Sequence, residues 1–236
     1  MMKKNKLNYP GKKLLVSSVF ILLALVGSAQ SSDPERISLG LHFDPVISWF
    51  GADIRQVDNE GARPGFNFGL TFNKYFSNNY AFSAGLNIIS AGGRLIHTDT
   101  TTMEFANLTA EVLPGNPVVY KIQYISIPVG LKLQTNQIGY VTFFTDLGID
   151  PKAVIGGKID IPSVDISGEK ATTELKTFCM SYHITAGIEY SLGGTTAAAF
   201  GLNFENIFTD ITKETGVQPK DRITHKMLGF RLGLIF

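Results

Sequence analysis

The chain has 236 residues, of which 44% are hydrophobic and only 17% are charged, and its formal net charge is +1. Soluble domains carry about 25% charged residues, so this chain is short of charge without being strongly apolar. The single cysteine excludes a disulfide-stapled fold, and 21 basic against 20 acidic residues exclude a basic nucleic-acid-binding protein.

The first 29 residues have the three parts of a secretory signal peptide. Lysines precede an apolar stretch over residues 14–26, and Gly27, Ser28 and Ala29 supply small residues for cleavage. The apolar stretch is shorter than the roughly 20 residues that a membrane-spanning helix needs. We therefore expect residues 1–29 to be removed and residues 30–236 to form one exported domain. That domain has 16 Lys and Arg against 20 acids, a formal charge of −4.

Apolar residues alternate with small or polar residues along most of the remaining chain, as in residues 37–44 and 65–72. A period of two is typical of β-strands that have one apolar and one polar face. A phase shift near Tyr124 and Ile125 predicts a bulge. The pattern predicts eight strands, near residues 36–47, 64–75, 79–95, 118–134, 138–154, 176–191, 196–210 and 225–236.

The connections between the predicted strands alternate strictly between short and long. The short ones cover residues 76–78, 135–137 and 192–195, and the long ones cover residues 48–63, 96–117, 155–175 and 211–224. This layout is typical of outer-membrane barrels, which have short periplasmic turns and long extracellular loops. It predicts an all-β fold, an eight-stranded antiparallel up-and-down transmembrane β-barrel in the bacterial outer membrane.

Glycine recurs at the same place in the predicted strands. The pattern Gly-aliphatic-any-apolar, as in Gly69-Leu70-Thr71-Phe72, occurs in seven of the eight strands, and its glycine always falls on the polar face. Glycine normally weakens a strand, but it suits a narrow barrel whose interior has room only for its own side chains.

The alternative is a soluble exported barrel that keeps its apolar face inside and binds an apolar ligand. The membrane barrel is favoured because the polar face is small and Gly-rich, and because aromatic residues gather near both strand ends. Phe236, in phase with Leu232 and Leu234, also resembles the C-terminal signal read by barrel-assembly machinery. The aromatic residues are Tyr75, Phe76, Tyr80, Tyr140 and Tyr190 near the short turns, and Trp49, Phe50, Tyr120, Phe178 and Phe208 near the long loops.

Residues 124–132, Tyr-Ile-Ser-Ile-Pro-Val-Gly-Leu-Lys, are similar to the Tyr-x-x-Ile-Pro-x-x-x-Lys strand of the PorT-like outer-membrane β-barrel family of Bacteroidota. Residues 148–158 and 232–236 and the Ala29-Gln30 pair also fit this family. The resemblance covers nearly the whole mature chain and implies a barrel, whereas the motifs specify no activity. The namesake of the family takes part in type IX secretion and gliding, so the resemblance points to a secretion or surface assembly.

The polar faces of the strands place acids and bases together inside the predicted barrel. Buried charges need partners, so we expect ion pairs and hydrogen bonds to fill the lumen. A proton or ion path is the alternative, although eight strands usually leave no open channel. The expected inward residues are His42, Asp44, Asn67, Asn87, Lys132, Asp146, His183, Glu189, Asn203, Glu205 and Arg231.

A lipid-modifying enzyme is a further alternative, because Ser181 and His183 share one face and Asp146 or Glu189 would orient the histidine. The four histidines and Cys179 have no metal-ligand spacing, so neither metal nor cofactor is expected. We expect a non-catalytic structural or interaction protein. Its expected partners are outer-membrane lipid, barrel-assembly machinery and proteins that bind the polar loops 98–102 and 165–173, unless these loops are simply mobile.

Overall fold

The computed structural model describes residues 36–52, 57–104, 109–171, 175–213 and 222–236. The predicted signal peptide, residues 1–29, lies outside the described residues, so its cleavage stays a prediction. Within the described part of the chain, no helix is long and apolar enough to cross a membrane.

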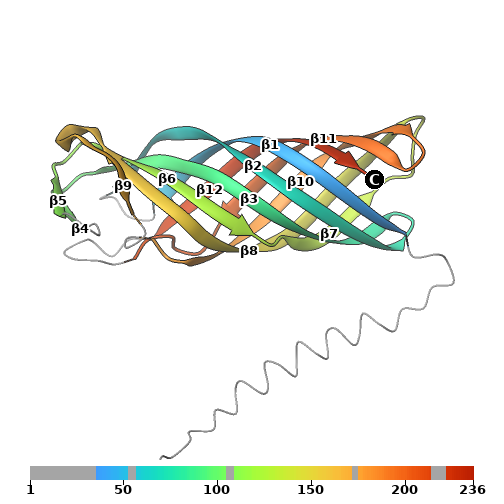
Figure 1. The fold of residues 1–236 in the computed structure, drawn as a ribbon, viewed down its shortest axis with the longest axis horizontal. Helices are drawn as coiled ribbons and strands as arrows, with labels where there is room; N and C mark the ends of the chain where they lie inside the picture. Colours follow the sequence, from blue (N-terminus) through green and yellow to red (C-terminus); the bar gives the residue numbers. More distant parts are fainter. Residues whose placement is uncertain (1–35, 53–56, 105–108, 172–174, 214–221) are drawn as a thin grey trace, which may run out of the picture. The chain divides into compact units, whose positions relative to one another are not determined.

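Residues 37–236 contain a closed antiparallel barrel of eight strands, one of which is interrupted (Figure 1). Each strand pairs with its neighbours along the chain, and the last strand pairs with the first, so the predicted fold is confirmed. In ring order the strands are β1 (Ile37–Ala52), β2 (Val57–Ser77), β3 (Tyr80–His97), β6 (Pro117–Ser126) with β7 (Val129–Gln134), β8 (Val141–Ile161), β10 (Phe178–Gly193), β11 (Thr196–Ile207) and β12 (Ile223–Ile235).

The fourth strand of the ring is broken at Pro128, which lacks a backbone N–H. The register against β3 and β8 continues unchanged across the break, and the Ile127 N–H donates to the Pro151 carbonyl at 3.0 Å. A register shift between Gln123 and Tyr124 confirms the predicted irregularity to within one residue. The extra residue, however, is Ile155 on the partner strand β8.

The short connections lie at one end of the barrel, as predicted. The one that joins β10 to β11 contains Gly193 and Gly194, whose φ angles of 109° and 61° favour glycine. The described parts of the long connections contain more regular structure than predicted. They hold the hairpin of β4 (Thr101–Glu104) and β5 (Thr109–Val112), the 3₁₀ helix η1 (Pro162–Val164) and strand β9 (Ile166–Lys170), which pairs with β8. The barrel wall therefore continues beyond the predicted strand ends.

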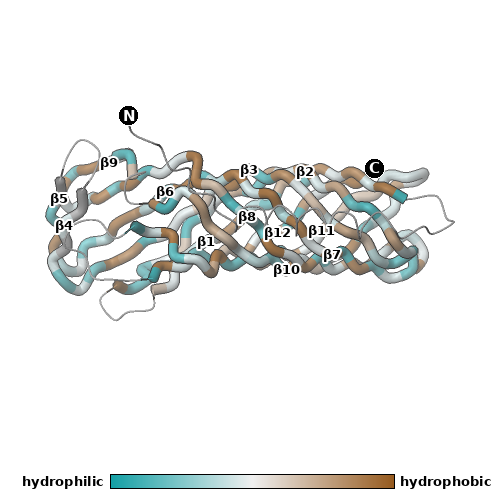
Figure 2. The backbone as a smooth tube through the Cα atoms, turned by 90° about the horizontal axis from the view of Figure 1, so that it is seen from below, coloured by the Kyte–Doolittle hydropathy of each residue, from teal (hydrophilic) through white to brown (hydrophobic). Residues whose placement is uncertain are grey.

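The two faces of each strand differ sharply in exposure. On β1, Leu41 and Phe43 are 42% and 47% exposed, whereas His42 and Asp44 are 4% and 0% exposed. Hydrophobic and hydrophilic residues accordingly alternate along the strands in Figure 2. An apolar outer surface of this extent requires lipid around it. The soluble-barrel alternative is therefore wrong, because it would place these apolar residues inside.

The predicted aromatic girdles are only partly correct. Near the short turns Phe76, Tyr80, Tyr140 and Tyr190 face outwards, and near the long loops Phe178 and Phe208 do so while Trp49 is half-buried. Tyr75, Phe50 and Tyr120 instead point into the barrel, with 7%, 1% and 5% exposure. Successive side chains of a strand point to opposite faces, and these three residues fall at the inward positions. Their position in the strand therefore outweighs the preference of aromatic rings for the membrane interface.

The barrel interior has two parts. Towards the short turns it is polar, and towards the long loops it is filled by apolar side chains that the sequence pattern did not predict. We call this second part the loop-end core, and its largest fully buried members are Phe50, Ile89, Leu95, Ile122, Tyr124, Ile159, Ile161, Leu175, Ile207 and Ile211.

Candidate functional site in the barrel interior

The residues predicted to face the lumen all lie inside the barrel, and all are buried except Arg231, whose side chain is 13% exposed. The antiparallel register brings them together from different strands. Glu205 on β11 stands opposite His183 on β10, and Lys132 on β7 stands opposite Asp146 on β8. Residues distant in sequence thus form one interior layer.

Two glycines make room for this layer: Gly69 from the repeated pattern, and Gly148 from the one predicted strand that lacks it. A Cβ atom on Gly69 would lie 2.0 Å from Asn87 Oδ1 and 2.6 Å from His42 Nε2, and one on Gly148 would lie 2.6 Å from His183 Cε1. Real Cβ atoms do not approach other atoms so closely. Crowding of the interior polar side chains therefore explains the repeat glycine at Gly69 and the separate glycine at Gly148.

Asp44 is the centre of one polar cluster. Its Oδ2 accepts hydrogen bonds from Arg231 Nη2 at 3.1 Å and from Asn67 Nδ2 at 3.3 Å, and its Oδ1 lies 3.1 Å from His42 Nδ1. His42 Nε2 is 3.3 Å from Asn87 Oδ1. Arg231 Nε also donates to Oδ1 at 3.4 Å, so this fully buried carboxylate is paired with a cation and hydrogen-bonded on both oxygens, as burial requires.

His183 lies between two carboxylates in a second cluster. Its Nδ1 is 2.6 Å from Asp150 Oδ1, and its Nε2 is 3.3 Å from Asp146 Oδ1. Ser83 Oγ donates to the other oxygen of Asp146 at 2.8 Å. Ser181 Oγ lies 3.0 Å from Asp150 Oδ2, so β3, β8 and β10 are joined by one set of hydrogen bonds.

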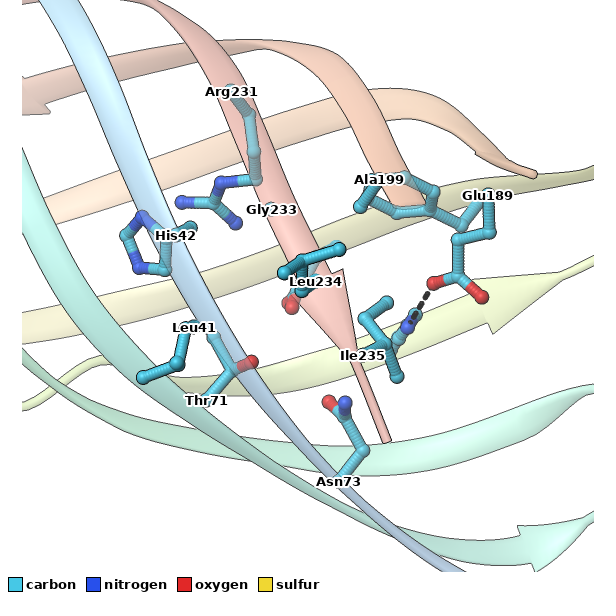
Figure 3. A pocket seen from close by; sticks show the side chains of 13 residues that line it. Leu41, His42, Thr71, Asn73, Glu189, Ala199, Arg231, Gly233, Leu234 and Ile235 are labelled. Carbon is cyan, nitrogen blue, oxygen red and sulfur yellow. Dashed lines mark hydrogen bonds and ion pairs between the residues drawn. The ribbon is translucent and has the colours of Figure 1, made fainter. Parts of the chain in front are cut away.

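Two lysine ion pairs complete the network. Lys132 pairs with Glu189 near the short turns, where Figure 3 marks the contact at Glu189 with a dashed line. Lys152 pairs with Glu205 and also donates to Ser126 Oγ at 3.2 Å. Each lysine is almost wholly buried and reaches its partner across strands.

Sequence reasoning missed Asp150 and Lys152, which are 2% and 1% exposed. Both lie an even number of residues from Asp146 on β8 and therefore share its inward face. Taking every second residue from Asp146 along β8 identifies both as inward-facing.

Phe236 lies beside the first strand. Its N–H donates to the Leu39 carbonyl at 2.7 Å, and the Leu39 N–H donates to the Phe236 carbonyl at 3.1 Å. Its ring is half exposed on the same outer face as Leu234. Its role as an assembly signal stays a prediction.

Residues 28–209 match the family described as outer membrane protein beta-barrel domain. The chain belongs to this family. Together with the apolar outer surface, this membership confirms the predicted location of the barrel in the bacterial outer membrane. No match was found among curated proteins.

Solved structures similar to this outer-membrane barrel include Neisserial surface protein A, with 9% identity over 84% of this chain and 95% of that chain and a TM-score of 0.44. OprG from Pseudomonas aeruginosa has 9% identity over 84% and 94% of the two chains, with a TM-score of 0.43. The outer membrane protease OmpT from Escherichia coli has 10% identity over 89% and 99%, with a TM-score of 0.39.

The outer-membrane barrel does not arrange Ser181 and His183 as a nucleophile and its base. Ser181 Oγ lies 2.7 Å from Glu205 Oε1 and 3.0 Å from Asp150, while both ring nitrogens of His183 face carboxylates. Activation of a serine requires its hydroxyl to donate to the histidine. In this geometry the Ser181 hydroxyl and both ring nitrogens of His183 are hydrogen-bonded to carboxylates instead of to each other. The cluster therefore balances buried charge.

The lumen holds little free space. Two pockets among the polar side chains measure about 30 Å³ and 20 Å³, and each has room for about one water molecule. Among the described residues, no group of three or more His, Cys, Asp or Glu side chains is placed to hold a metal ion.

Proposed function

We propose that this outer-membrane barrel is a non-catalytic interaction protein whose ordered loop end binds protein partners in a secretion or surface assembly. The observation that carries the proposal is the loop-end core, which fixes the shape of the barrel beyond its lipid-facing part. Outer-membrane lipid and barrel-assembly machinery, through Phe236, are its further proposed partners.

The filled interior favours an interaction role over transport. Ion pairs occupy the polar half, and Phe50, Ile122 and Ile159 are at most 1% exposed in the apolar half. A solute crossing the barrel would have to break buried ion pairs and then part a packed apolar core. Both steps are costly, because unpaired buried charges and cavities each cost several kcal/mol.

The described part of the loop end is a pre-ordered surface. Leu175, Ile161 and Ile211 are at most 2% exposed and anchor the chain segments beside β9 and after β11. Lys176 pairs with Asp210 and links the two connections. Binding by such a surface loses less conformational entropy than binding by mobile loops, which favours a recognition role.

The secretion role rests on the resemblance to the PorT-like family. The residues that carry the resemblance have identifiable tasks in this barrel: Tyr124 is buried at the loop-end core, Pro128 breaks the strand, and Lys132 pairs with Glu189. These tasks support a shared way of building the barrel wall. They leave the identity of the partner to experiment.

Photo-crosslinking in native membranes tests the proposal. A photoreactive residue would replace exposed Ser163 or Ser167 at the loop end, or exposed Gln137 at the short turns as the matched control. We expect a discrete protein adduct from the loop-end positions and a different pattern from Gln137. Absence of any loop-end adduct would contradict the proposal, and a changed lipid profile in a His183→Ala strain would favour the enzyme alternative.

A further inference from the structure

Three lysines form a single row across the outer face of the barrel wall. Lys121 on β6 stands opposite Lys158 on β8, and Lys158 stands opposite Lys170 on β9. All three are exposed. Like charges directly opposite one another destabilise a sheet, so structural needs alone do not explain this row.

Little negative charge offsets the row. Asp160 pairs with Lys121, and Glu169 stands opposite Ile159 and so lies on the other face of the sheet. Among the described residues, no carboxylate lies within ion-pair distance of Lys158 or Lys170. The row therefore keeps a surplus of positive charge.

The lysines border a pocket of about 570 Å³ in which Arg63 of β2 is a fourth cation. The rest of the lining includes four small residues, Ser90 and Ala91 from β3 and Gly156 and Gly157 from β8, together with Pro64, Gln123 and Ile155. The pocket is thus a depression surrounded by ammonium and guanidinium groups, which bind phosphate oxygens by charge-assisted hydrogen bonds.

The pocket lies next to the lipid-facing surface. Ile155, 57% exposed, also lines it and precedes Lys158 by three residues. Three residues span about 10 Å along a strand, or roughly 7–8 Å along the membrane normal at the usual strand tilt. That distance corresponds to the headgroup layer, which adds about 5–7 Å to each side of the hydrocarbon core.

We propose that this pocket binds the phosphate of a lipid headgroup in the outer leaflet, with the acyl chains lying along the apolar wall below Ile155. We assign the phosphate to a lipid because the pocket lies next to the lipid-facing surface. A headgroup held at Lys158 would leave its acyl chains beside lipid-facing residues. Each basic residue at a membrane surface adds to the attraction for anionic lipid.

Native mass spectrometry of the folded full-length chain in neutral detergent tests the site. The probes are diphosphorylated lipid A and the same lipid after removal of its phosphates. We expect preferential binding of the phosphorylated form, and about a thirtyfold weaker affinity in Lys158→Gln/Lys170→Gln, the change expected for two surface lysines. The matched control is Lys213→Gln/Lys226→Gln, which removes the same charge outside the pocket.

Two outcomes would overturn the proposal. One is equal loss of affinity in both double variants, which would mean that net charge alone attracts the lipid. The other is displacement of the lipid by an equal concentration of inorganic phosphate, which would identify a site for free anions. A heat-dependent shift in gel mobility, measured for every variant, verifies that each barrel is folded.

Discussion

Lys152 and Glu205 form an ion pair inside the barrel with side chains that are only 1% and 4% exposed. The pair joins β8 to β11 although β10 lies between them in the ring. Ser181 of β10 also contacts Glu205, at 2.7 Å, so the three strands share one buried contact.

Breaking this pair from one side should destabilise the barrel. Lys152→Met leaves Glu205 buried without its cation, and we expect the free energy of unfolding to fall by about 3–5 kcal/mol. The double variant Lys152→Met/Glu205→Gln should recover most of that loss, because no uncompensated charge remains. Urea unfolding in lipid vesicles measures both, and a double variant as unstable as the single one would contradict the expectation.

The cost of placing a charge on the lipid-facing surface should depend on its depth in the membrane. Ile149 and Ile155 are 51% and 57% exposed on β8, at the middle and at the loop-end edge of its apolar face. Ile149→Arg should cost about 2–4 kcal/mol and Ile155→Arg about 0–1 kcal/mol. Unfolding in vesicles gives both values, and equal costs would show that the membrane boundary has been misplaced.

The loop-end core should control local opening. Phe50 packs edge-on against Tyr120 with ring centroids 5.6 Å apart and also contacts the His225 ring. Phe50→Ala should cost about 3–5 kcal/mol and raise amide exchange in the loop-end parts of β8 and β12. Phe43→Ala, on the outer face of the same strand, is the control and should leave that exchange unchanged.

The pair of Lys176 and Asp210 should make the connection after β11 sensitive to acid. Burial raises the pKa of Asp210, but Lys176 and the N–H groups of Ile223 and Thr212 outweigh it and lower the pKa below 3.8. With the pKa lowered in the folded state, the stabilisation is present above 3.8 and lost as the pH falls through the lowered value.

Amide exchange checks this expectation. Protection at Thr212 and Ile223 should be high near neutral pH and should be lost at acid pH below 3.8, once Asp210 is protonated. Asp210→Asn should show the lower protection at neutral pH as well. Wild-type protection that does not change with acid would mean that Asp210 does not hold the connection.

The strands and their inward polar residues were predictable because a period of two assigns each residue to a face. His42 and Asp44 illustrate this, since both alternate with exposed apolar neighbours. The loop-end core was not predictable in the same way. Ile88 is 49% exposed and faces lipid, while its neighbour Ile89 is fully buried in the core. Two adjacent apolar residues therefore conceal the alternation in the sequence. The contacts of Lys152 depend on register across three strands, which no single strand reveals.

The two-part interior has a consequence for assembly. Along β3 the apolar phase reverses between Ile88 and Ile89, and along β12 it reverses between Leu228 and Met227. On the short-turn side of the reversal the apolar residues face outwards, and the strand is stable only in lipid. On the loop side they face inwards, as in an ordinary water-soluble sheet. Each such strand therefore marks, in its own sequence, the loop-end boundary of the bilayer.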